Sequence, residues 1–587
     1  MKHDMTVGDP AKTLVVFAIP MILGNLFQQF YNLVDSMIVG NFVGEEALAA
    51  VGSSFAVTML FIAVAIGASI AGGRAMTCCK HVGLNVMADP FFTASYTGVN
   101  AGLVIAVADD PGMHSSQNEQ DSRHYAIASK IPMLEPSDSH ESIAFVKEAY
   151  EISEKFDTPV FLKMCTRVAH SQSVVEENER VLPEQKEYVK DGAKYIMMPG
   201  NAKKRHPIVE ARTVALTEYA ETAFFNRVEE GSDNSVGIIT SSTSYQYVKE
   251  VCGDKYPVLK LGMINPLPVN KIIDFASKVR TVIVVEELDG IIESHCNNIG
   301  VKVSGKEIFG LIGEFSQNMV AEKLGEAVPS GIALDENIPM RPPVMCAGCP
   351  HRGLFYTLKK NKLTVMGDIG CYTLGAVAPL NAIDTTICMG ASISGLHGFN
   401  KANEGATDGK TVAVIGDSTF MHSGVTGLIN IAYNNSNSTV IILDNSITGM
   451  TGHQQNPTTG YNLKGDPAAK INLEALCKSV GINSVRVVDP YDLAECNTVI
   501  KEELAKDEPS VIISRRPCAL LKYVKHAGPI KTNTDKCVGC KMCMQIGCPA
   551  VSMENGKVKI DNTLCTGCGV CSQMCKFDVF ESVKGDK

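Results

Sequence analysis

The sequence predicts an α/β protein in which several parallel-sheet domains precede a small, cysteine-rich C-terminal domain. Strand-like and helix-like patterns alternate over residues 235–287, and a helical stretch separates two apolar strands at 411–416 and 440–444. Such alternation is typical of parallel sheets flanked by helices. Eight of the 20 cysteines fall within residues 537–575. The length of 587 residues is enough for about three to five domains of ~100–200 residues each.

The composition narrows the class of protein. With 45% hydrophobic and 20% charged residues, the chain is neither disordered nor collagen-like. Its formal net charge of −10 argues against a nucleic-acid partner, which would require a basic face. The mean hydropathy of +0.07 excludes a chain made largely of membrane spans. Because no signal-peptide pattern precedes the clustered cysteines, we expect metal-binding thiols in a reducing cytoplasm rather than a disulfide framework.

The N-terminal segment differs from the rest of the chain. Residues 13–34 and 47–73 contain no charged side chain, and each run exceeds the ~20 residues that cross a bilayer. We expect apolar helices here, either of membrane type or buried in a core. Residues 18–40 resemble the opening of a multidrug and toxin extrusion (MATE) transporter. The resemblance implies that residues 1–67 are a transporter-like part of a chimeric chain, with membrane contact through residues 1–73.

Two such helices are too few for transport, because that family needs about a dozen helices around a cavity. The alternative function is therefore a membrane-associated or transport-derived redox protein that acts only as an electron carrier.

The middle of the chain divides into three segments. Residues 68–171 contain a buried strand at 103–109 followed by a polar loop, and ligands bind at such strand ends in α/β sheets. Residues 172–231 are rich in charge and fit a linker with a surface helix. Residues 232–330 alternate strands with helical patterns and predict a small α/β domain. Neither a Walker phosphate loop nor a dinucleotide fingerprint is present in the sequence.

A candidate cofactor site follows in the C-terminal half. One apolar strand runs into Gly416, Asp417 and Ser418, and a second ends at Asn445. A parallel sheet brings both strand ends to the same edge. Because Mg²⁺ prefers oxygen ligands, we predict a Mg²⁺ site formed by Asp417, Asn445 and a backbone carbonyl near Ile447, completed by diphosphate oxygens. A Gly-Asp pair alone is usually an ordinary turn, so the matched second strand is what favours a site.

The last segment carries two runs of cysteines with iron–sulfur spacing. The runs are Cys537, Cys540, Cys543 and Cys548, and then Cys565, Cys568, Cys571 and Cys575. In such runs three thiolates hold one [4Fe–4S] cube and the fourth serves the other cube. We therefore predict one cluster on Cys537, Cys540, Cys543 and Cys575, and another on Cys565, Cys568, Cys571 and Cys548. Zinc also accepts four thiolates, but two complete crossed runs favour iron–sulfur. Residues 526–587 resemble a bacterial two-cluster ferredoxin domain.

The candidate cofactor site carries a second resemblance. Residues 416–445 resemble the thiamine diphosphate signature, with a serine in place of its last glycine. Residues 448–454 resemble the thiamine-binding loop of 2-oxoacid:ferredoxin oxidoreductases. Together with residues 346–353 and 367–371, these motifs resemble the alpha subunits of indolepyruvate ferredoxin oxidoreductases from about residue 68 to the end. The cofactor-binding residues that this implies are Gly416, Asp417, Ser418, Asn445, Ile447, Gly449, Met450 and Thr451.

The resemblance implies a fold, a reaction and partners. Residues 68–171 would be part of a pyrimidine-binding domain, 232–330 a transketolase C-terminal-like domain and 335–525 the pyrophosphate-binding domain. The reaction would be thiamine diphosphate-dependent oxidative decarboxylation of arylpyruvates such as indolepyruvate to aryl-acetyl-CoA, with electrons passing through [4Fe–4S] clusters to ferredoxin. The partners would be a smaller beta subunit, ferredoxin, an arylpyruvate and coenzyme A. His453 and His422 are candidates for proton transfer, or for hydrogen-bonding the loop or the diphosphate.

Four further cysteines leave two interpretations open. Cys346, Cys349, Cys371 and Cys518 follow the order of the cysteines that hold a proximal cluster in the pyruvate branch of the family. They are either the ligands of a third [4Fe–4S] cluster or free thiols packed around the cofactor.

One element of the family pattern is missing from this sequence. The family carries a glutamate that hydrogen-bonds the aminopyrimidine, and by position it should lie near Thr58 or Ala63. Between Glu46 and Glu119 the sequence contains no glutamate. The resemblance therefore implies a chain that binds its cofactors but is impaired in catalysis, since acid–base help contributes about 10²–10⁴-fold.

Overall fold

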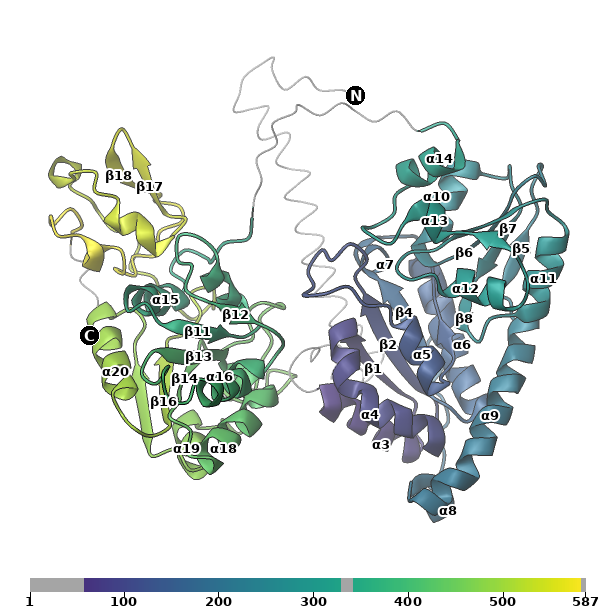
Figure 1. Cartoon of the computed structure of the whole chain (residues 1–587), viewed down its shortest axis with the longest axis horizontal. Coiled ribbons are helices and arrows are strands. Elements are labelled where there is room, and N and C mark those ends of the chain that lie inside the picture. Colours follow the sequence, from purple (N-terminus) through teal and green to yellow (C-terminus); the bar gives the residue numbers. More distant parts are fainter. Residues whose placement is uncertain (1–57, 329–341, 582–587) are drawn as a thin grey trace. The chain divides into compact units, whose positions relative to one another are not determined.

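The computed structural model describes residues 58–328 and 342–581, and side chains from residue 62 onward. The chain divides into two compact units, Met1–Ala333 and Leu334–Lys587 (Figure 1). The apolar helix expected at 13–34 lies outside the described residues. Within the described ranges, no helix combines the length and the apolar character that a membrane crossing needs.

The first unit begins with a five-stranded sheet. Its strands run in the order β1 (Ala75–Lys80), β2 (Leu103–Asp109), β4 (Val160–Cys165), β3 (Met133–Leu134) and β8 (Met263–Asn265). The first four strands are parallel, and β8 pairs antiparallel with β3. Since β8 comes from the segment predicted as a separate domain at 232–330, that segment contributes an edge strand to the first sheet.

Helices cover both faces of this sheet, as its largely buried strands require. One face carries α3 (Thr58–Ile70), α4 (His81–Thr97) and α5 (Arg123–Ser129), and the other carries α6 (Ser139–Phe156) and α9 (Pro199–Thr222). Two short helices, α7 (Thr166–His170) and α8 (Gly192–Tyr195), complete this part.

Helix α3 contains part of the second uncharged run. Ile62 is fully buried and Ala65 is 6% exposed, so one face of the helix belongs to the core of the α/β domain. The boundary expected between residues 67 and 68 falls within α3.

The second sheet of the first unit also has five strands. Their order is β10 (Val303–Ser304), β9 (Val282–Val285), β6 (Gly237–Ser241), β7 (Val258–Leu261) and β5 (Arg227–Glu229), of which only β5 is antiparallel to its neighbour. The helices that pack on its two faces are α10 (Ser242–Cys252), α13 (Lys306–Phe309) and α14 (Gln317–Leu324) on one, and α11 (Val269–Ser277) and α12 (Ile291–Asn298) on the other.

A buried arginine joins the two sheets of the first unit. The Arg123 guanidinium lies 2.6 Å from both the Asp121 and the Glu286 carboxylates and donates to the carbonyls of Glu287 and Asp289. Arg123 is 1% exposed, so these partners supply the hydrogen bonds that a buried charge needs.

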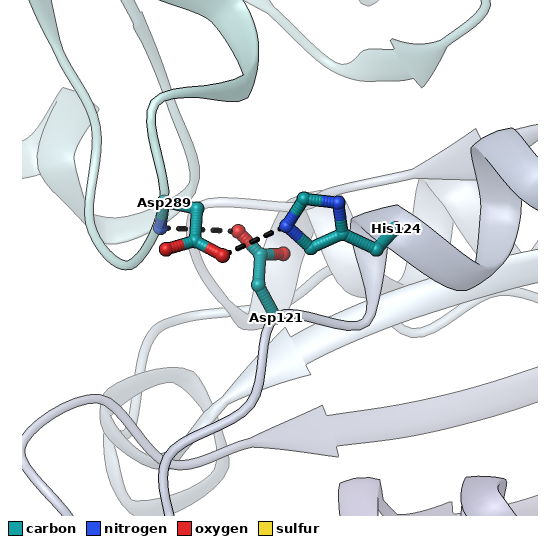
Figure 2. A group of neighbouring side chains, drawn as sticks. All are labelled: Asp121, His124 and Asp289. Atoms are coloured by element: carbon teal, nitrogen blue, oxygen red, sulfur yellow. Dashed lines mark hydrogen bonds and ion pairs between the residues drawn. The ribbon is translucent and has the colours of Figure 1, made fainter.

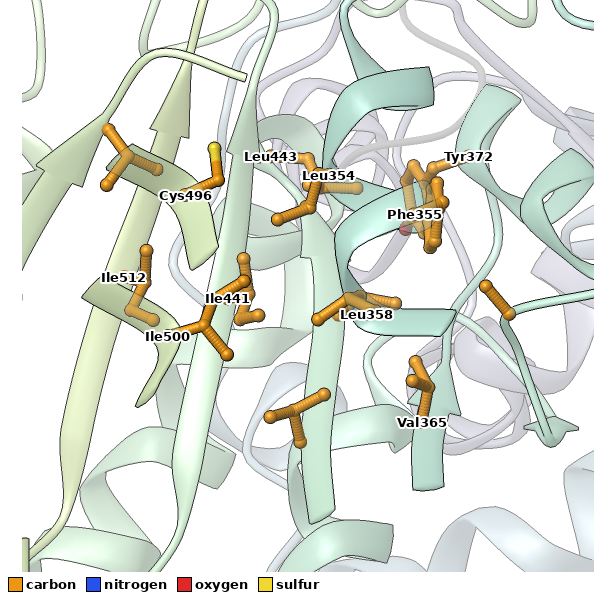
Figure 3. Close-up of a cluster of buried hydrophobic side chains, with 14 of the residues drawn as sticks. Leu354, Phe355, Leu358, Val365, Tyr372, Ile441, Leu443, Cys496, Ile500 and Ile512 are labelled. Carbon is orange, nitrogen blue, oxygen red and sulfur yellow. The ribbon is translucent and has the colours of Figure 1, made fainter. Parts of the chain in front are cut away.

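The second unit is built on a six-stranded, fully parallel sheet. Its strands run in the order β12 (Thr385–Thr386), β11 (Thr364–Gly367), β13 (Thr411–Gly416), β14 (Thr439–Asp444), β16 (Ser510–Arg515) and β15 (Ser484–Val488). Figure 3 shows the core on one face, where α15 (His351–Lys360) and α20 (Leu493–Leu504) pack against the strands. The opposite face carries α16 (Ala391–Ala402), α18 (Val425–Tyr433) and α19 (Leu473–Ser479).

The cysteine-rich segment packs against the same unit. Its hairpin of β17 (Val551–Glu554) and β18 (Lys557–Ile560) is antiparallel. Its small core includes Tyr356 and Tyr491 of the larger domain. The described part of the chain is therefore α/β with parallel sheets and a small C-terminal domain, as the sequence predicts.

Candidate cofactor and electron-transfer site

The carboxyl ends of neighbouring strands in the second unit carry the predicted site residues. Asp368 follows β11, Asp417 follows β13 and Asn445 follows β14, and Cys518 comes three residues after β16. These strands are adjacent in the sheet, so one edge gathers oxygen and sulfur donors, as expected for the ligand-binding edge of an α/β sheet.

Asp417 is a buried carboxylate with neutral partners. It is 3% exposed; Oδ1 accepts from the Ser418 amide at 2.7 Å and Oδ2 from the Thr458 hydroxyl at 3.1 Å. Burial, reinforced by the nearby Asp444 carboxylate, raises the pKa of Asp417 to about 7. Within residues 342–581 no basic side chain pairs with it. A divalent cation would relieve this cost, because metal binding favours the ionised ligand.

Gly416 is required by close packing rather than by backbone freedom. A Cβ at this position would lie 2.7 Å from the Tyr372 ring, so any larger residue would displace either the strand end or the tyrosine. The contact with Tyr372 therefore fixes the strand end from which Asp417 follows.

Asn445 holds the start of the predicted thiamine-binding loop. Its side-chain Oδ1 accepts from the Ile447 amide at 3.2 Å, and its carbonyl accepts from the Cys518 amide at 2.9 Å. Thr448 and Gln454 exchange two backbone hydrogen bonds, which closes residues 448–454 into a compact loop.

This loop lies next to two of the four additional cysteines. A Cβ on Gly449 would lie 3.6 Å from the Cys371 sulfur, and His453 Nε2 lies 3.9 Å from the Cys518 sulfur. Burial raises the pKa of Cys371, and negative charge on Cys518 and Cys346 adds to the effect. Burial likewise raises the pKa of Cys349 to about 12. The loop therefore lies beside Cys371 and Cys518, and Cys346 and Cys349 are near enough to Cys371 to interact with it electrostatically.

The remaining predicted loop residues differ in exposure. Thr451 donates its hydroxyl to the Gln454 side chain at 2.6 Å, whereas the Met450 side chain is 57% exposed.

The two candidate histidines occupy separate places. His453 lies on the loop next to Cys518. His422 lies in a π-helical turn, Phe420–Gly424, directly after the Gly-Asp segment, and its Nδ1 is 2.9 Å from the Ser423 hydroxyl. Burial lowers the pKa of His422, so the neutral imidazole is favoured there. Such π-turns are frequent at functional sites.

Asp368 belongs to the motif at 367–371, but we assigned it no role from the sequence. It is fully buried, and its carboxylate accepts from the backbone amides of Gly390 and Ser392 at the start of α16. Burial raises its pKa. The sequence pattern that could have indicated a role for Asp368 is a Gly-Asp pair after an apolar strand, as at Asp417.

The eight C-terminal cysteines line two cavities. One cavity is lined by Cys537, Cys540, Cys543 and Cys575, and the other by Cys548, Cys565, Cys568 and Cys571. The backbone amide of Val558 points at the Cys537 sulfur at 3.4 Å, and the hydroxyl oxygen of Thr566 is buried without a hydrogen-bond partner among the described residues. Four C-terminal thiols around each cavity fit a [4Fe–4S] cube, and the second cavity is also lined by Cys349.

The first unit holds one further group of metal-type ligands. Figure 2 shows Asp121, His124 and Asp289 side by side. Their ligand atoms lie within 4.8 Å of one another, and among the described residues this is the group of that kind. Asp121, however, is already bonded to Arg123 and accepts from the Asp289 amide, while His124 pairs with Asp289 at 2.7 Å. We interpret this group as part of the contact between the two sheets.

Comparison with known proteins identifies the family. The chain is 40% identical over 575 residues to the indolepyruvate oxidoreductase subunit IorA of Pyrococcus horikoshii, with 89% of this chain and 88% of that protein covered. The chain belongs to the IorA family. The subunit IorA of Archaeoglobus fulgidus is 39% identical over 527 residues, with 84% of each chain covered. The predicted resemblance to this family is thus confirmed.

Family profiles place the domains of this IorA-family chain. Residues 61–234 match the pyruvate flavodoxin/ferredoxin oxidoreductase thiamine diphosphate-binding domain, 368–514 the C-terminal thiamine pyrophosphate-binding domain and 558–581 a 4Fe-4S binding domain. The chain is therefore an oxidoreductase subunit with thiamine diphosphate and iron–sulfur domains.

The N-terminus matches a different family. Residues 20–77 match the MatE profile. A 60-residue stretch is 42% identical to the probable multidrug resistance protein YpnP of Bacillus subtilis, covering 10% of this chain and 14% of that protein. The predicted MATE-like resemblance is confirmed for this segment alone.

Proposed function

We propose that this chain binds Mg²⁺ and thiamine diphosphate at the edge of its six-stranded sheet and carries out the oxidative decarboxylation of an arylpyruvate, with indolepyruvate the named substrate of its relatives. The observation that supports this most is the loop at 448–454. It connects Asn445, a ligand of the proposed Mg²⁺ site, with the sulfurs of Cys371 and Cys518. A cofactor held there would lie next to an exit for electrons.

Each residue has a definite task in this proposal. Asp417 and Asn445 would hold Mg²⁺, and the carbonyl near Ile447 would complete the protein's share of the ligands. When bound, thiamine diphosphate supplies the carbanion chemistry and the clusters accept electrons one at a time. His453 would hold or move a proton at Nε2. His422, kept neutral by burial, would act as a hydrogen-bond donor or acceptor at Nε2, since its Nδ1 bonds Ser423.

The number of clusters follows from the cysteine sets. The two cavities support two [4Fe–4S] clusters, on Cys537, Cys540, Cys543 and Cys575 and on Cys565, Cys568, Cys571 and Cys548. The set of Cys346, Cys349, Cys371 and Cys518 supports a third. At roughly four irons per cube, about twelve irons per chain would support three clusters, and about eight would reduce the proposal to two.

Catalysis in this chain is proposed to be impaired. The family's aminopyrimidine-binding glutamate has no counterpart between Glu46 and Glu119. Without that carboxylate, the imino tautomer of a bound aminopyrimidine would not be promoted, and acid–base help of this kind contributes about 10²–10⁴-fold. We expect cofactor binding without efficient turnover.

One experiment tests binding and turnover together. The full chain, reconstituted with iron and sulfide and mixed with the smaller partner subunit, is assayed for bound thiamine diphosphate, for iron, and for arylpyruvate- and coenzyme A-dependent reduction of ferredoxin or a viologen dye. Bound cofactors with turnover ~10²–10⁴-fold below that of the Pyrococcus relative support the whole proposal. Turnover equal to that of the relative contradicts the impairment.

The same assay distinguishes the proposed decarboxylase from a second candidate function. The match of residues 20–77 to the MatE profile favours a membrane-associated electron carrier without decarboxylase chemistry. Clusters without bound thiamine diphosphate, together with binding to lipid vesicles, would support that function and reject the first. A cytoplasmic location is the expectation of the first candidate.

A further inference from the structure

Arg352 is a buried cation located between two groups of cysteines. It lies in the first turn of α15, three residues after Cys349, and is 4% exposed. Its guanidinium donates to the carbonyls of Met345 and Cys346 on one side and to those of Ile546 and Gly547 on the other, with distances of 3.2 Å to Cys346 and to Ile546. It therefore joins the Cys346–Cys349 turn to the ferredoxin-like domain.

All of these acceptors are neutral, which leaves the charge of Arg352 without a partner. In residues 342–581 it forms no salt bridge, whereas the nearby Arg516 pairs with Asp489 and stacks on Tyr491. Burial lowers the pKa of Arg352, and negative charge on Cys548, Cys349, Cys346 and Cys568 would raise it again. A buried unpaired charge is costly. An anionic group held by these thiols would offset that cost by pairing electrostatically with the guanidinium.

The cavity beside Arg352 supplies a place for that anion. Arg352 and Cys349 line the same cavity as Cys548, Cys565, Cys568 and Cys571. The backbone on its two sides approaches closely: a Cβ on Gly348 would lie 2.3 Å from the Thr566 hydroxyl oxygen. The Tyr491 hydroxyl donates to the Gly348 carbonyl across the same contact. The other cavity, lined by Cys537, includes neither Arg352 nor Cys349.

We propose that Arg352 raises the reduction potential of the cluster held by Cys548, Cys565, Cys568 and Cys571 and fixes that cluster against the Cys346–Cys349 turn, so that electrons enter the ferredoxin-like domain there. Reduction adds one negative charge, which a nearby guanidinium stabilises, and net charge is one of the factors that set cluster potentials. In each step the proposed third [4Fe–4S] cluster on the Cys346 side would be oxidised by one electron and this cluster reduced by one, with no proton moved. The inference rests on the proposed binding of iron–sulfur clusters.

The test is a potentiometric titration of the reconstituted full chain, followed by electron paramagnetic resonance. Signals are assigned to the two clusters with Cys540→Ser and Cys565→Ser. Arg352→Gln removes the charge and should lower the reduction equilibrium constant of the Cys565 cluster about tenfold, which is ~59 mV for one electron, and leave the Cys540 cluster unchanged. Arg352→Lys keeps the positive charge but loses the several N–H donors of the guanidinium. It should therefore shift the potential of the Cys565 cluster less than Arg352→Gln does.

Lys557→Gln is the matched control. Lys557 donates to the Cys537 carbonyl beside the other cavity, so its removal should leave the Cys565 cluster at its original potential. Equal potentials in Arg352→Gln and the unmodified chain, or an equal shift of both clusters, would overturn the inference. If Arg352→Gln does not retain iron, Arg352→Met, which also removes the charge but keeps an apolar stem, decides: a shift in the negative direction supports the inference, and no shift overturns it. Iron absent from the unmodified chain would instead reject the proposed function.

Discussion

At the scale of single residues, Asp417 is the residue on which we expect cofactor binding to depend most. Its buried carboxylate has neutral hydrogen-bond donors and an anionic neighbour, Asp444. Asp417→Asn keeps the shape and removes the negative charge that a divalent cation needs. We expect the Mg²⁺-dependent affinity for thiamine diphosphate to fall more than about tenfold, measured by calorimetry at fixed Mg²⁺. The matched control is Asp507→Asn, an exposed carboxylate of the same domain. Equal affinities in both variants would contradict a metal-ligand role.

The residue scale also shows how far sequence reasoning reaches into the site. Asp417 and Asn445 were predicted because a strand that ends in an oxygen donor is a local pattern. The proximity of Cys371 and Cys518 to the loop was expected only through the family resemblance. Arg352 was not assigned a role, because its importance comes from carbonyls at positions 546 and 547, almost 200 residues away. Contacts of that kind have no local signal.

At the scale of elements, α3 tests whether the uncharged run at 47–73 serves a core or a membrane. Ile62 is fully buried, while Val64 on the same helix is 57% exposed. Ile62→Ala should destabilise the first unit by ~2–5 kcal/mol, the cost of a cavity in a packed core, and Val64→Ala should change it by less than ~0.5 kcal/mol. Amide hydrogen exchange in β1 and β2 measures both. Equal protection in the two variants would mean that α3 does not support this sheet.

Sheet topology is the level at which the domain prediction was least complete. The sequence indicates strands and helices in 232–330, but it does not show that Met263–Asn265 leaves its own sheet and pairs with β3. That pairing joins residues about 130 positions apart, such as Met133 and Asn265. Nothing in the side chains of these residues indicates which of them pair. The neighbouring strands at 411–416 and 440–444 were easier to predict, because both are apolar and a helix separates them.

At the scale of the whole molecule, the proposed ligands divide unequally between the two compact units. All the cysteines assigned to clusters, together with Asp417 and Asn445, lie in Leu334–Lys587. The first unit contributes the domain that matches the oxidoreductase thiamine diphosphate-binding profile over residues 61–234, and the MATE-like match over residues 20–77 overlaps its start. We therefore expect cofactor retention and turnover to depend on different parts of one chain.

This division gives a prediction for a fragment of residues 334–587. Because it contains every proposed ligand of Mg²⁺ and of the clusters, it should hold the same amount of iron per chain as the full protein and bind thiamine diphosphate in the presence of Mg²⁺. It should not reduce a viologen dye with arylpyruvate, since it lacks the first unit. Iron analysis, calorimetry and the dye assay, run side by side on the fragment and the full chain, measure the three properties. A fragment that folds, judged by its circular dichroism, but holds less iron would show that the first unit is needed for cluster retention. That result would contradict the assignment of every cluster ligand to the second unit.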